Sequence, residues 1–374
     1  MDNRCTLPFT GPSQVLLHRG TSAGCCKIPQ VKFDKETGLL TQSLKELRQS
    51  VLNNERNAQC ENCWKIDDAG GPSLRRRASQ HFNSEIDWES FDVNQPVRHV
   101  EISFSNKCQM MCAYCHPAVS SMWQDNISEF SEFKSLEKIE FESDIKIEDL
   151  VDVNNLQMLQ VTGGEPMLEK SCVDFLKRLE FKIDRQMSIV TNLSYGPAVL
   201  SSLLEIIERH PTINVYVSLD EVGDNPYRKY FNWTLWNTNF NVLADNLKER
   251  RKKFPKCFMM IKSTLGITNY DKIQGIIEYV LNKRRRGFPG LTFDVNPLAH
   301  SELTSLQSGV IDTTKIISLP ASSYNFLSER EKATVMHVNQ LIQNSRPVEQ
   351  YKEHTIKFLS KYNATATSGE KTND

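Results

Sequence analysis

Three cysteines stand close together in one short segment, Cys108-Gln-Met-Met-Cys112-Ala-Tyr-Cys115. They follow a run from Val100 to Ser105 whose alternating residues predict a strand. Thiolates on one tight loop at the end of a strand can all bind the same small object, an iron–sulfur cluster or a metal ion. Three ligands where four are usual leave one position open for chemistry. A zinc site completed by His116 is the alternative, although adjacent ligands such as Cys115 and His116 are geometrically awkward.

A second motif, Thr162-Gly163-Gly164-Glu165-Pro166, directly follows the predicted strand 156–161. Two glycines let the backbone approach a ligand closely, and the glutamate offers a carboxylate to a cationic group. Pro166 suits the first turn of a following helix. Alone, the motif also fits a plain strand–helix turn, but its place one strand after the three cysteines makes it specific.

Together these residues resemble the radical S-adenosylmethionine (SAM) superfamily. Cys108, Cys112 and Cys115, with the aromatic Tyr114 before the last cysteine, resemble its cluster loop. Gly163-Gly164-Glu165 resembles its motif for the methionine amino group of SAM. The resemblance covers roughly residues 98–300. It implies a partial (β/α)6 barrel and a [4Fe–4S] cluster on the three cysteines, with SAM bound to the open iron through its amino and carboxylate groups.

The resemblance also implies a reaction. One electron cleaves the sulfonium of SAM, and the released 5′-deoxyadenosyl radical takes a hydrogen atom from a substrate. A small electron donor such as flavodoxin or ferredoxin is the implied partner. Besides Tyr114, the residues that fall where family members contact SAM are Asn192, Ser218, Asp220 and, beside the adenine, Asn296. Each of these four could equally serve a turn or a helix cap.

Five further cysteines precede residue 64: Cys5, Cys25, Cys26, Cys60 and Cys63. Cys60 and Cys63 have metal-type C-x2-C spacing, and Cys5 with Cys25 or Cys26 would complete four ligands. The layout resembles the twitch and SPASM modules that hold an auxiliary iron–sulfur cluster, although those modules usually follow the barrel. A closed second cluster would suit electron transfer or structure. A structural zinc is the alternative, and the choice between Cys25 and Cys26 stays open, with Cys25 slightly favoured.

Composition narrows the class of protein. Of 374 residues, 39% are apolar and 24% charged, which is ordinary for a soluble globular protein. A formal net charge of -1 gives no case for nucleic acid or an anionic membrane as the main partner. We find no signal-peptide pattern and no apolar run of the roughly 18–20 residues that span a bilayer. We therefore expect a cytoplasmic protein, whose ten cysteines stay reduced.

Strands that alternate with helices must position these motifs. The predicted strands are 98–104, 156–161, 186–191, 213–219, 257–265 and 291–295, and the predicted helices are 169–180, 197–209, 235–252 and 269–285. Helix-length crossovers between strands predict a parallel sheet covered by helices, a partial TIM-type α/β barrel. In such barrels the chemistry gathers at the carboxyl ends of the strands, where both motifs fall.

Four segments follow from this pattern. Residues 1–95 form a Cys-rich auxiliary module, with a strand at Val15–His18 and a helix over 39–52. Residues 96–300 form the barrel, within which 117–150 is expected to be mostly helical. Residues 301–362 add helices, at Glu329–Gln343 and Val348–Tyr362, and residues 363–374 form a disordered tail.

The sequence thus predicts a soluble radical SAM oxidoreductase or modifying enzyme. Its substrate is a peptide or a small metabolite. The alternative from a different class is a zinc-stabilised binding protein on a β/α scaffold, without catalysis.

Overall fold

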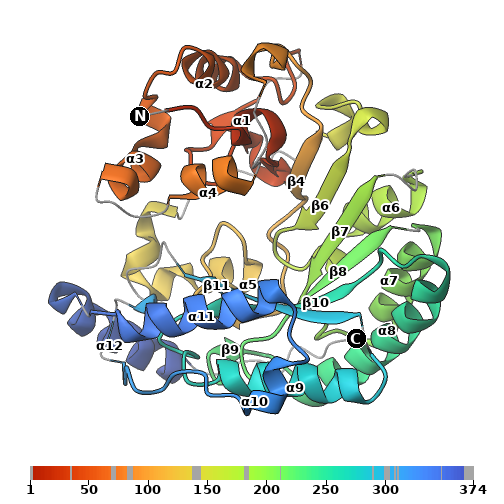
Figure 1. Cartoon of the computed structure of the whole chain (residues 1–374), viewed down its shortest axis with the longest axis vertical. Helices are drawn as coiled ribbons and strands as arrows, with labels where there is room; N and C mark the ends of the chain where they lie inside the picture. The colour runs from red at the N-terminus through yellow and green to blue at the C-terminus, as the bar shows by residue number, and fades with distance from the viewer. Residues whose placement is uncertain are drawn as a thin grey trace. The chain divides into compact units, whose positions relative to one another are not determined.

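The computed structural model describes residues 3–33, 36–68, 73–81, 87–136, 145–180, 185–210, 212–288, 290–298, 304–306, 309, 311–346 and 348–365. The chain forms two compact units (Figure 1). The first unit comprises residues 1–106, 138–163 and 180–187, and the second comprises residues 107–137, 164–179 and 188–374. The domain boundaries drawn from the sequence stay predictions.

The first unit contains a five-strand stretch of sheet in the order β6-β4-β1-β2-β3. Its strands are β1 (Ser13–Leu16), β2 (Thr21–Ala23), β3 (Val31–Lys32), β4 (His99–Ser103) and β6 (Met158–Thr162). β4 pairs in parallel with β6 on one side and with β1 on the other, with Ser13 opposite Val100. The N-terminal segment therefore supplies a strand that extends the β4–β6 sheet.

Four helices complete the first unit: α1 (Leu7–Thr10), α2 (Gln42–Leu52), α3 (Glu61–Asp68) and α4 (Leu74–His81). α2 starts after Thr41, whose side chain accepts a hydrogen bond from the Leu44 backbone N–H at 3.2 Å. Such a cap satisfies an amide that the helix itself leaves unpaired. The apolar face of α2 buries Leu47 and Val51 against Phe9 of α1, so this small unit has a core of its own.

The second unit carries the strand–helix alternation. β7 (Gln186–Thr191), β8 (Ile213–Ser218), β10 (Met259–Leu265) and β11 (Leu291–Pro297) lie in the order β11-β10-β8-β7, and β10 is parallel to both of its neighbours. Their helices are α6 (Lys170–Arg178), α7 (Pro197–Arg209), α8 (Trp233–Lys253) and α9 (Ile273–Arg285). Apolar strand residues such as Ile213, Val215 and Val217 are fully buried, as a parallel sheet covered by helices requires.

Smaller elements of the second unit flank this sheet. β5 (Met111–Cys112) and β9 (Arg228–Lys229) form an antiparallel two-stranded ribbon. After β11 come α10 (Ala321–Tyr324), α11 (Glu329–Gln343) and α12 (Glu349–Ala364). Ser328 and Glu331 form a reciprocal capping box at the start of α11.

All six predicted barrel strands are present, most with ends shifted by one or two residues, and so are the four helices between them. The mixed α/β fold with parallel strands and covering helices agrees with the predicted partial TIM-type architecture. Among the described residues, no helix is both long and apolar enough to cross a membrane.

Three local predictions are wrong. The described part of 117–150 contains one short α-helix, α5 (Ser121–Asp125), and 3-10 turns such as Ser131–Leu136, because its apolar residues lack a sustained helical period. The first strand begins at Ser13, and Leu17–Arg19 turns into a 3-10 helix that ends at Gly20. α12 extends to Ala364, into the expected tail, whose residues 366–374 lie outside the described residues.

Candidate active site

The three-cysteine loop is fastened to its surroundings at each end. The Cys108 backbone N–H donates to the Ser121 hydroxyl at 3.1 Å, and that hydroxyl donates to the Cys108 carbonyl at 3.1 Å. Cys112 lies in β5, opposite Arg228 of β9. The Cys115 backbone N–H closes a turn onto the Cys112 carbonyl at 2.9 Å. Backbone contacts therefore hold all three thiols on one short loop.

The three cysteines of the loop are half-buried. Burial raises the pKa of Cys108 well above its usual value and raises that of Cys115 to about 12. The charge of Cys112 adds to both increases. The Met110 backbone N–H donates to the Cys108 sulfur at 3.4 Å. Mutually repelling thiolates in a buried loop are stabilised when a cationic iron centre binds them, so this set of donors fits an iron–sulfur cluster.

Gly163 makes the turn that brings Glu165 to the site. Its φ of 120° lies in a region that residues with a side chain rarely adopt. A Cβ on Gly163 would lie 2.3 Å from the Ser103 hydroxyl oxygen. One residue past Gly164, the Glu165 backbone N–H donates to the Lys107 carbonyl at 2.7 Å. The predicted Gly-Gly-Glu turn is thus a tight one that requires glycine at its first position.

The Glu165 carboxylate lies within the second unit and is 1% exposed. It accepts hydrogen bonds from the Asn192 backbone N–H at 2.7 Å and from the Thr191 hydroxyl at 2.9 Å. Burial raises the pKa of Glu165 to about 7, although these donors oppose the shift. Binding a cationic amino group would restore the charged form, so the carboxylate suits the role predicted for it.

Asn192 links this carboxylate to the cysteine loop. Its side chain exchanges two hydrogen bonds with Gln109, one of 3.0 Å and one of 3.2 Å. Gln109 also donates to the Ser194 carbonyl at 2.7 Å. Because Gln109 directly follows Cys108, the two predicted motifs meet through one hydrogen-bonded chain: Glu165, Asn192, Gln109.

Asp220 holds Tyr114, the aromatic residue of the loop. The Tyr114 hydroxyl donates to the Asp220 carboxylate in a short hydrogen bond, and the Thr264 backbone N–H donates to it at 2.8 Å. Arg228 forms an ion pair with the same carboxylate at 3.3 Å. Asp220 and Tyr114 were predicted to contact SAM. These contacts make the Asp220 carboxylate a support for the loop, and its contact with SAM stays a prediction.

Ser218 and Asn296 lie at strand ends, as predicted. Ser218 closes β8 and stands opposite Lys262 of β10. Asn296 lies in β11 and stands opposite Thr264. Its side chain is exposed and its amide donates to Asp294 at 3.5 Å. Neither residue contacts the chain from Glu165 to Gln109 in the hydrogen bonds described, so their roles stay predictions.

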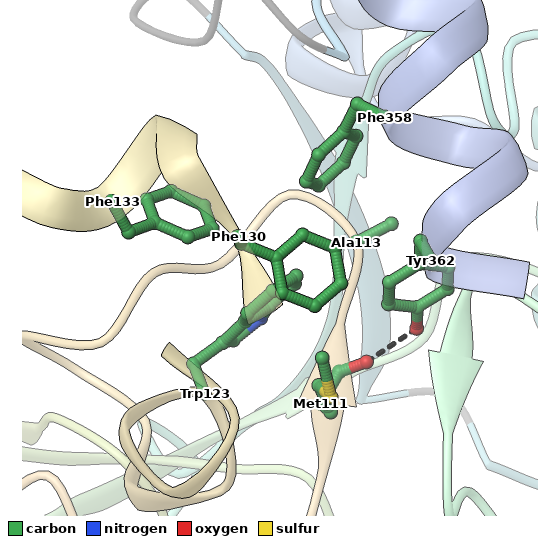
Figure 2. Close-up of a cluster of buried hydrophobic side chains, with 7 residues drawn as sticks. All are labelled: Met111, Ala113, Trp123, Phe130, Phe133, Phe358 and Tyr362. Atoms are coloured by element: carbon green, nitrogen blue, oxygen red, sulfur yellow. Dashed lines mark hydrogen bonds between the residues drawn. The ribbon is translucent and has the colours of Figure 1, made fainter. Parts of the chain in front are cut away.

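A cluster of aromatic side chains packs against the three-cysteine loop. Figure 2 shows Trp123, Phe130, Phe133, Phe358 and Tyr362 packed around Met111 and Ala113. The Trp123 indole N–H donates to the Cys112 carbonyl at 2.8 Å. The Tyr362 hydroxyl, from α12, donates to the Met111 carbonyl and accepts from the Lys229 backbone N–H at 3.2 Å. Trp123 is thus a fully buried packing residue of this cluster.

Comparison with known proteins agrees with this geometry. The model of the radical SAM superfamily matches residues 102–280, a range that includes the loop, Glu165 and Asp220. Residues 102–280 form a radical SAM domain. The match identifies the chain as an enzyme and argues against the non-catalytic zinc protein considered above. The finer assignment to a twitch or SPASM subgroup stays a prediction.

Curated relatives of the radical SAM domain are named GTP 3′,8-cyclase. The Helicobacter pylori (strain HPAG1) protein is 24% identical over 191 residues, which is 51% of this chain and 54% of the relative. The probable GTP 3′,8-cyclase of Pyrococcus horikoshii is 25% identical over 189 residues, 50% of this chain and 53% of the relative. The GTP 3′,8-cyclase of Thermodesulfovibrio yellowstonii is 28% identical over 139 residues, 37% of this chain and 39% of the relative. The chain spans about half the length of the first two relatives.

Outside the radical SAM domain, four N-terminal cysteines lie near one another in the first unit. Burial raises the pKa of Cys5 to about 12, and charges on Cys60 and Cys63 add to the effect. A hydrogen bond between the Cys25 and Cys26 side chains raises the pKa of Cys25 and lowers that of Cys26 to about 7, and the charge of Cys5 adds a smaller increase to the pKa of Cys25. Cys26 is exposed, whereas Cys25 is half-buried. Which of the two would bind a metal stays a prediction.

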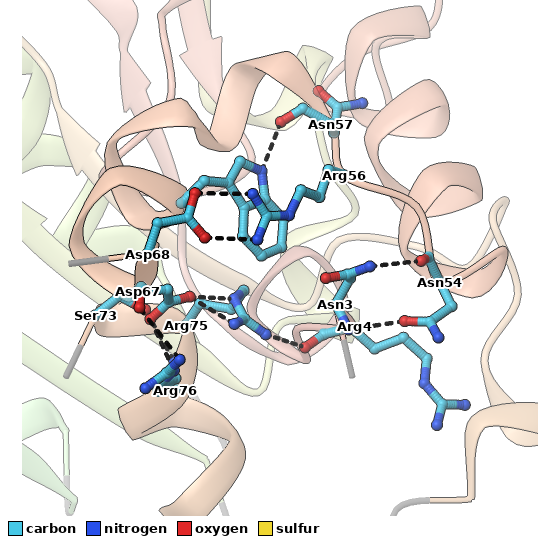
Figure 3. A network of polar contacts seen from close by, with 11 residues as sticks. Asn3, Arg4, Asn54, Arg56, Asn57, Asp67, Asp68, Ser73, Arg75 and Arg76 are labelled. Atoms are coloured by element: carbon cyan, nitrogen blue, oxygen red, sulfur yellow. Dashed lines mark hydrogen bonds and ion pairs between the residues drawn. The ribbon is translucent and has the colours of Figure 1, made fainter. Parts of the chain in front are cut away.

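An ion-pair network fixes the helix that carries Cys63. Figure 3 shows Arg75 of α4 paired with the buried Asp67 of α3, at 2.5 Å. Arg75 also stacks over Trp64, 4.5 Å from the ring centroid. Trp64 directly follows Cys63 and donates to the Asn57 carbonyl at 3.0 Å. Arg75 is 8% exposed, and its ion pair with Asp67 positions α3.

Within the described residues, no three His, Cys, Asp or Glu side chains already converge as a metal site. The ligand sets named from the sequence therefore stay predictions at both cysteine groups.

Sequence reasoning missed Arg228, Gln109 and Tyr362. Gln109 could have been suspected from its place inside the cysteine loop. Arg228 carried no signal, since it lies in a two-residue strand that no periodicity reveals. Tyr362 is 251 residues away from its partner Met111, so no local pattern joins them.

Proposed function

We propose that this chain is a radical SAM enzyme that reductively cleaves SAM and abstracts hydrogen from a substrate. Cys108, Cys112 and Cys115 would hold a [4Fe–4S] cluster. When bound, that cluster supplies the electron that splits SAM into methionine and a 5′-deoxyadenosyl radical. A small donor such as flavodoxin or ferredoxin would deliver the electron.

The observation that carries the proposal is the chain of hydrogen bonds from Glu165 through Asn192 to Gln109. It fixes a buried carboxylate at a set position relative to the cysteine loop, so that one ligand could reach both. A buried carboxylate attracts a cationic amino group strongly, because little water screens the charges. Burial of Glu165 and partial burial of the three cysteines also limit the access of water to the site, which protects a reactive radical.

The N-terminal cysteines support a second part of the proposal. Cys5, Cys25, Cys60 and Cys63 would hold an auxiliary iron–sulfur cluster that accepts or supplies an electron, and the net reaction would then be an oxidation. Mutual electrostatic influence among these thiols supports a shared ligand. A structural zinc on the same four residues is the competing occupant.

Iron content tests both sites. Protein reconstituted anaerobically should hold about eight irons, as two [4Fe–4S] clusters do. Replacing Cys108, Cys112 and Cys115 with Ala should remove about half of the iron and should abolish the change in the electron paramagnetic resonance (EPR) spectrum that SAM causes. The matched control is Cys172→Ala, since Cys172 is a buried cysteine of α6 in the same unit. Zinc without iron in the wild-type protein would contradict the proposal.

For the substrate, the relatives favour one candidate. Proteins named GTP 3′,8-cyclase align with half of this chain, so GTP is the first small metabolite to test. Reconstituted protein should consume GTP in a SAM-dependent manner if it shares their substrate. GTP left unchanged while SAM is cleaved would favour the other candidates named from the sequence, a peptide or a different metabolite.

A further inference from the structure

Arg228 is a buried cation directly beside the cysteine loop. It is 2% exposed and stands opposite Cys112 in the β5–β9 ribbon. The ribbon is further fixed by the Ala113 backbone N–H, which donates to the Tyr227 carbonyl at 2.8 Å. Both the charge and its distance from the loop are therefore set by backbone pairing.

Not all N–H donors of the Arg228 guanidinium are hydrogen-bonded. Its Nη1 lies 3.3 Å from the Asp220 carboxylate, and its Nη2 lies 4.0 Å from the Met110 sulfur. Apart from this ion pair of Nη1 with Asp220, neither Nε nor Nη1 has a hydrogen-bond partner within the described residues, although both atoms are buried. Leaving buried donors of a charged group unmet costs free energy, so such donors point to an anionic group at this position.

Besides Asp220, the sulfur of Cys112 is an anionic group that interacts with this guanidinium. Burial raises the pKa of Cys112, and the charge of Arg228 is the largest influence that lowers it. Arginine stays protonated in proteins, so this positive charge is permanent. A cluster gains one negative charge when it is reduced, and a fixed cation or an N–H donor at its sulfurs favours that state.

Asp220 supplies the opposing charge. Its carboxylate is 3% exposed and lies on the same guanidinium, with further hydrogen bonds from Tyr114 and the Thr264 backbone. A buried anion disfavours the addition of an electron nearby. The pair therefore places one charge of each sign next to the loop: Arg228 lies on the ribbon strand opposite Cys112, and Asp220 is bound by Tyr114 of the loop.

We propose that the Arg228–Asp220 pair sets the reduction potential of the cluster held by Cys108, Cys112 and Cys115, an inference that rests on the proposed function. Arg228 raises the potential and Asp220 limits that increase. The pair thereby decides which electron donors can reduce the site.

The test is a redox titration of the reconstituted full-length protein, followed by EPR. The signal of this cluster is the one that disappears in the triple Cys→Ala variant. Arg228→Gln should shift the midpoint to a lower potential, and Asp220→Asn should shift it to a higher one. The double variant should lie between the two. Arg228→Lys, which keeps the charge but loses the planar fork, should lie between wild type and Arg228→Gln.

Arg284→Gln is the matched control, since Arg284 forms an ion pair with the buried Glu331 between α9 and α11. It should leave the midpoint unchanged. Two results would overturn this inference and leave the proposed function standing: the iron-loaded Arg228→Gln and Asp220→Asn proteins keep the wild-type midpoint, or both shift it in the same direction. If Arg228→Gln does not fold, Arg228→Lys and Asp220→Asn decide it in the same way. A wild-type protein that binds no iron would instead overturn the proposed function, and this inference with it.

Discussion

At the scale of single residues, the site depends on a carboxylate that is uncharged about half of the time near neutral pH. Glu165 has a pKa of about 7 because burial outweighs its three hydrogen-bond donors. Tyr195, whose hydroxyl shares the Thr191 partner, and Cys172 have raised pKa values and stay protonated between pH 6 and 8. Of these three groups, Glu165 is therefore the one whose charge changes in this range.

We predict that SAM binds more weakly as the pH falls through 7. The free protein carries a charged Glu165 mostly above that pH, and protonation removes the charge that holds the amino group. For a single proton, affinity should fall about tenfold from pH 8 to pH 6. Anaerobic calorimetry at both pH values checks this. Glu165→Gln should bind weakly with little pH dependence, and a wild-type slope in that variant would assign the effect to another group.

Gly163 supports a prediction on stability. Gly163→Ala should destabilise the fold by about 1–3 kcal/mol, because Ala must adopt a strained φ and its Cβ meets Ser103. The control is Gly275→Ala in α9, where the added Cβ has no neighbour within 4 Å. That change should be neutral or stabilise by up to about 1 kcal/mol. Urea denaturation of both variants measures the difference, and equal midpoints would refute the reading of this turn.

At the scale of elements, two sets of contacts between helices and loops hold the cysteines in place. The loop in the second unit rests on α12 and on the aromatic cluster, and α3 in the first unit is held by α4. Both sets of contacts depend on residues, such as Tyr362 and Arg75, that look like ordinary core or surface positions in the sequence. Each can be weakened without touching a cysteine.

Tyr362→Phe removes the hydroxyl between Met111 and Lys229 and keeps the ring. We expect a loss of about 1–2 kcal/mol and a faster transfer of iron to an external chelator, because the β5–β9 ribbon loosens. Tyr279→Phe is the control, since its hydroxyl donates to Asn237 at 2.9 Å, outside the loop. Equal iron-release rates in the two variants would show that α12 does not secure the loop.

Arg75→Gln breaks the buried pair with Asp67. Removing one partner of such a pair costs about 3–5 kcal/mol, so α3 should shift and the N-terminal site should lose its metal. Arg56→Gln is matched to it, because Arg56 binds Asp68 of the same helix at an exposed position. That variant should keep its thermal midpoint and its metal. Metal retained in Arg75→Gln would separate the N-terminal site from this network.

At the scale of the whole molecule, sequence patterns predicted the strands, helices and turns whose conformation depends on residues close together in the chain. Strand 213–218 is rich in β-branched and aromatic residues, and at Gly163 the turn needs a positive φ that glycine adopts readily. Long-range pairings were not predictable. The parallel pairing of β1 with β4 and the approach of Arg228 to Cys112 depend on contacts between distant segments, which leave no periodic trace.

The same contrast between local patterns and long-range contacts explains which residues of the candidate site could be predicted from the sequence. Cysteine spacing and the Gly-Gly-Glu turn name the ligands because each lies within a few residues of chain. The Arg228–Asp220 ion pair and the contact of α12 with the cysteine loop could be recognised only from the three-dimensional structure.

We propose above all that a cluster on Cys108, Cys112 and Cys115 cleaves SAM. The direct measurement is the release of 5′-deoxyadenosine from anaerobically reconstituted protein, given SAM and a chemical reductant. We predict release by the wild type and by a Cys60→Ala/Cys63→Ala variant, and none by the triple variant of the loop. Release that survives in the triple variant, or is absent from iron-loaded wild type, would contradict the account.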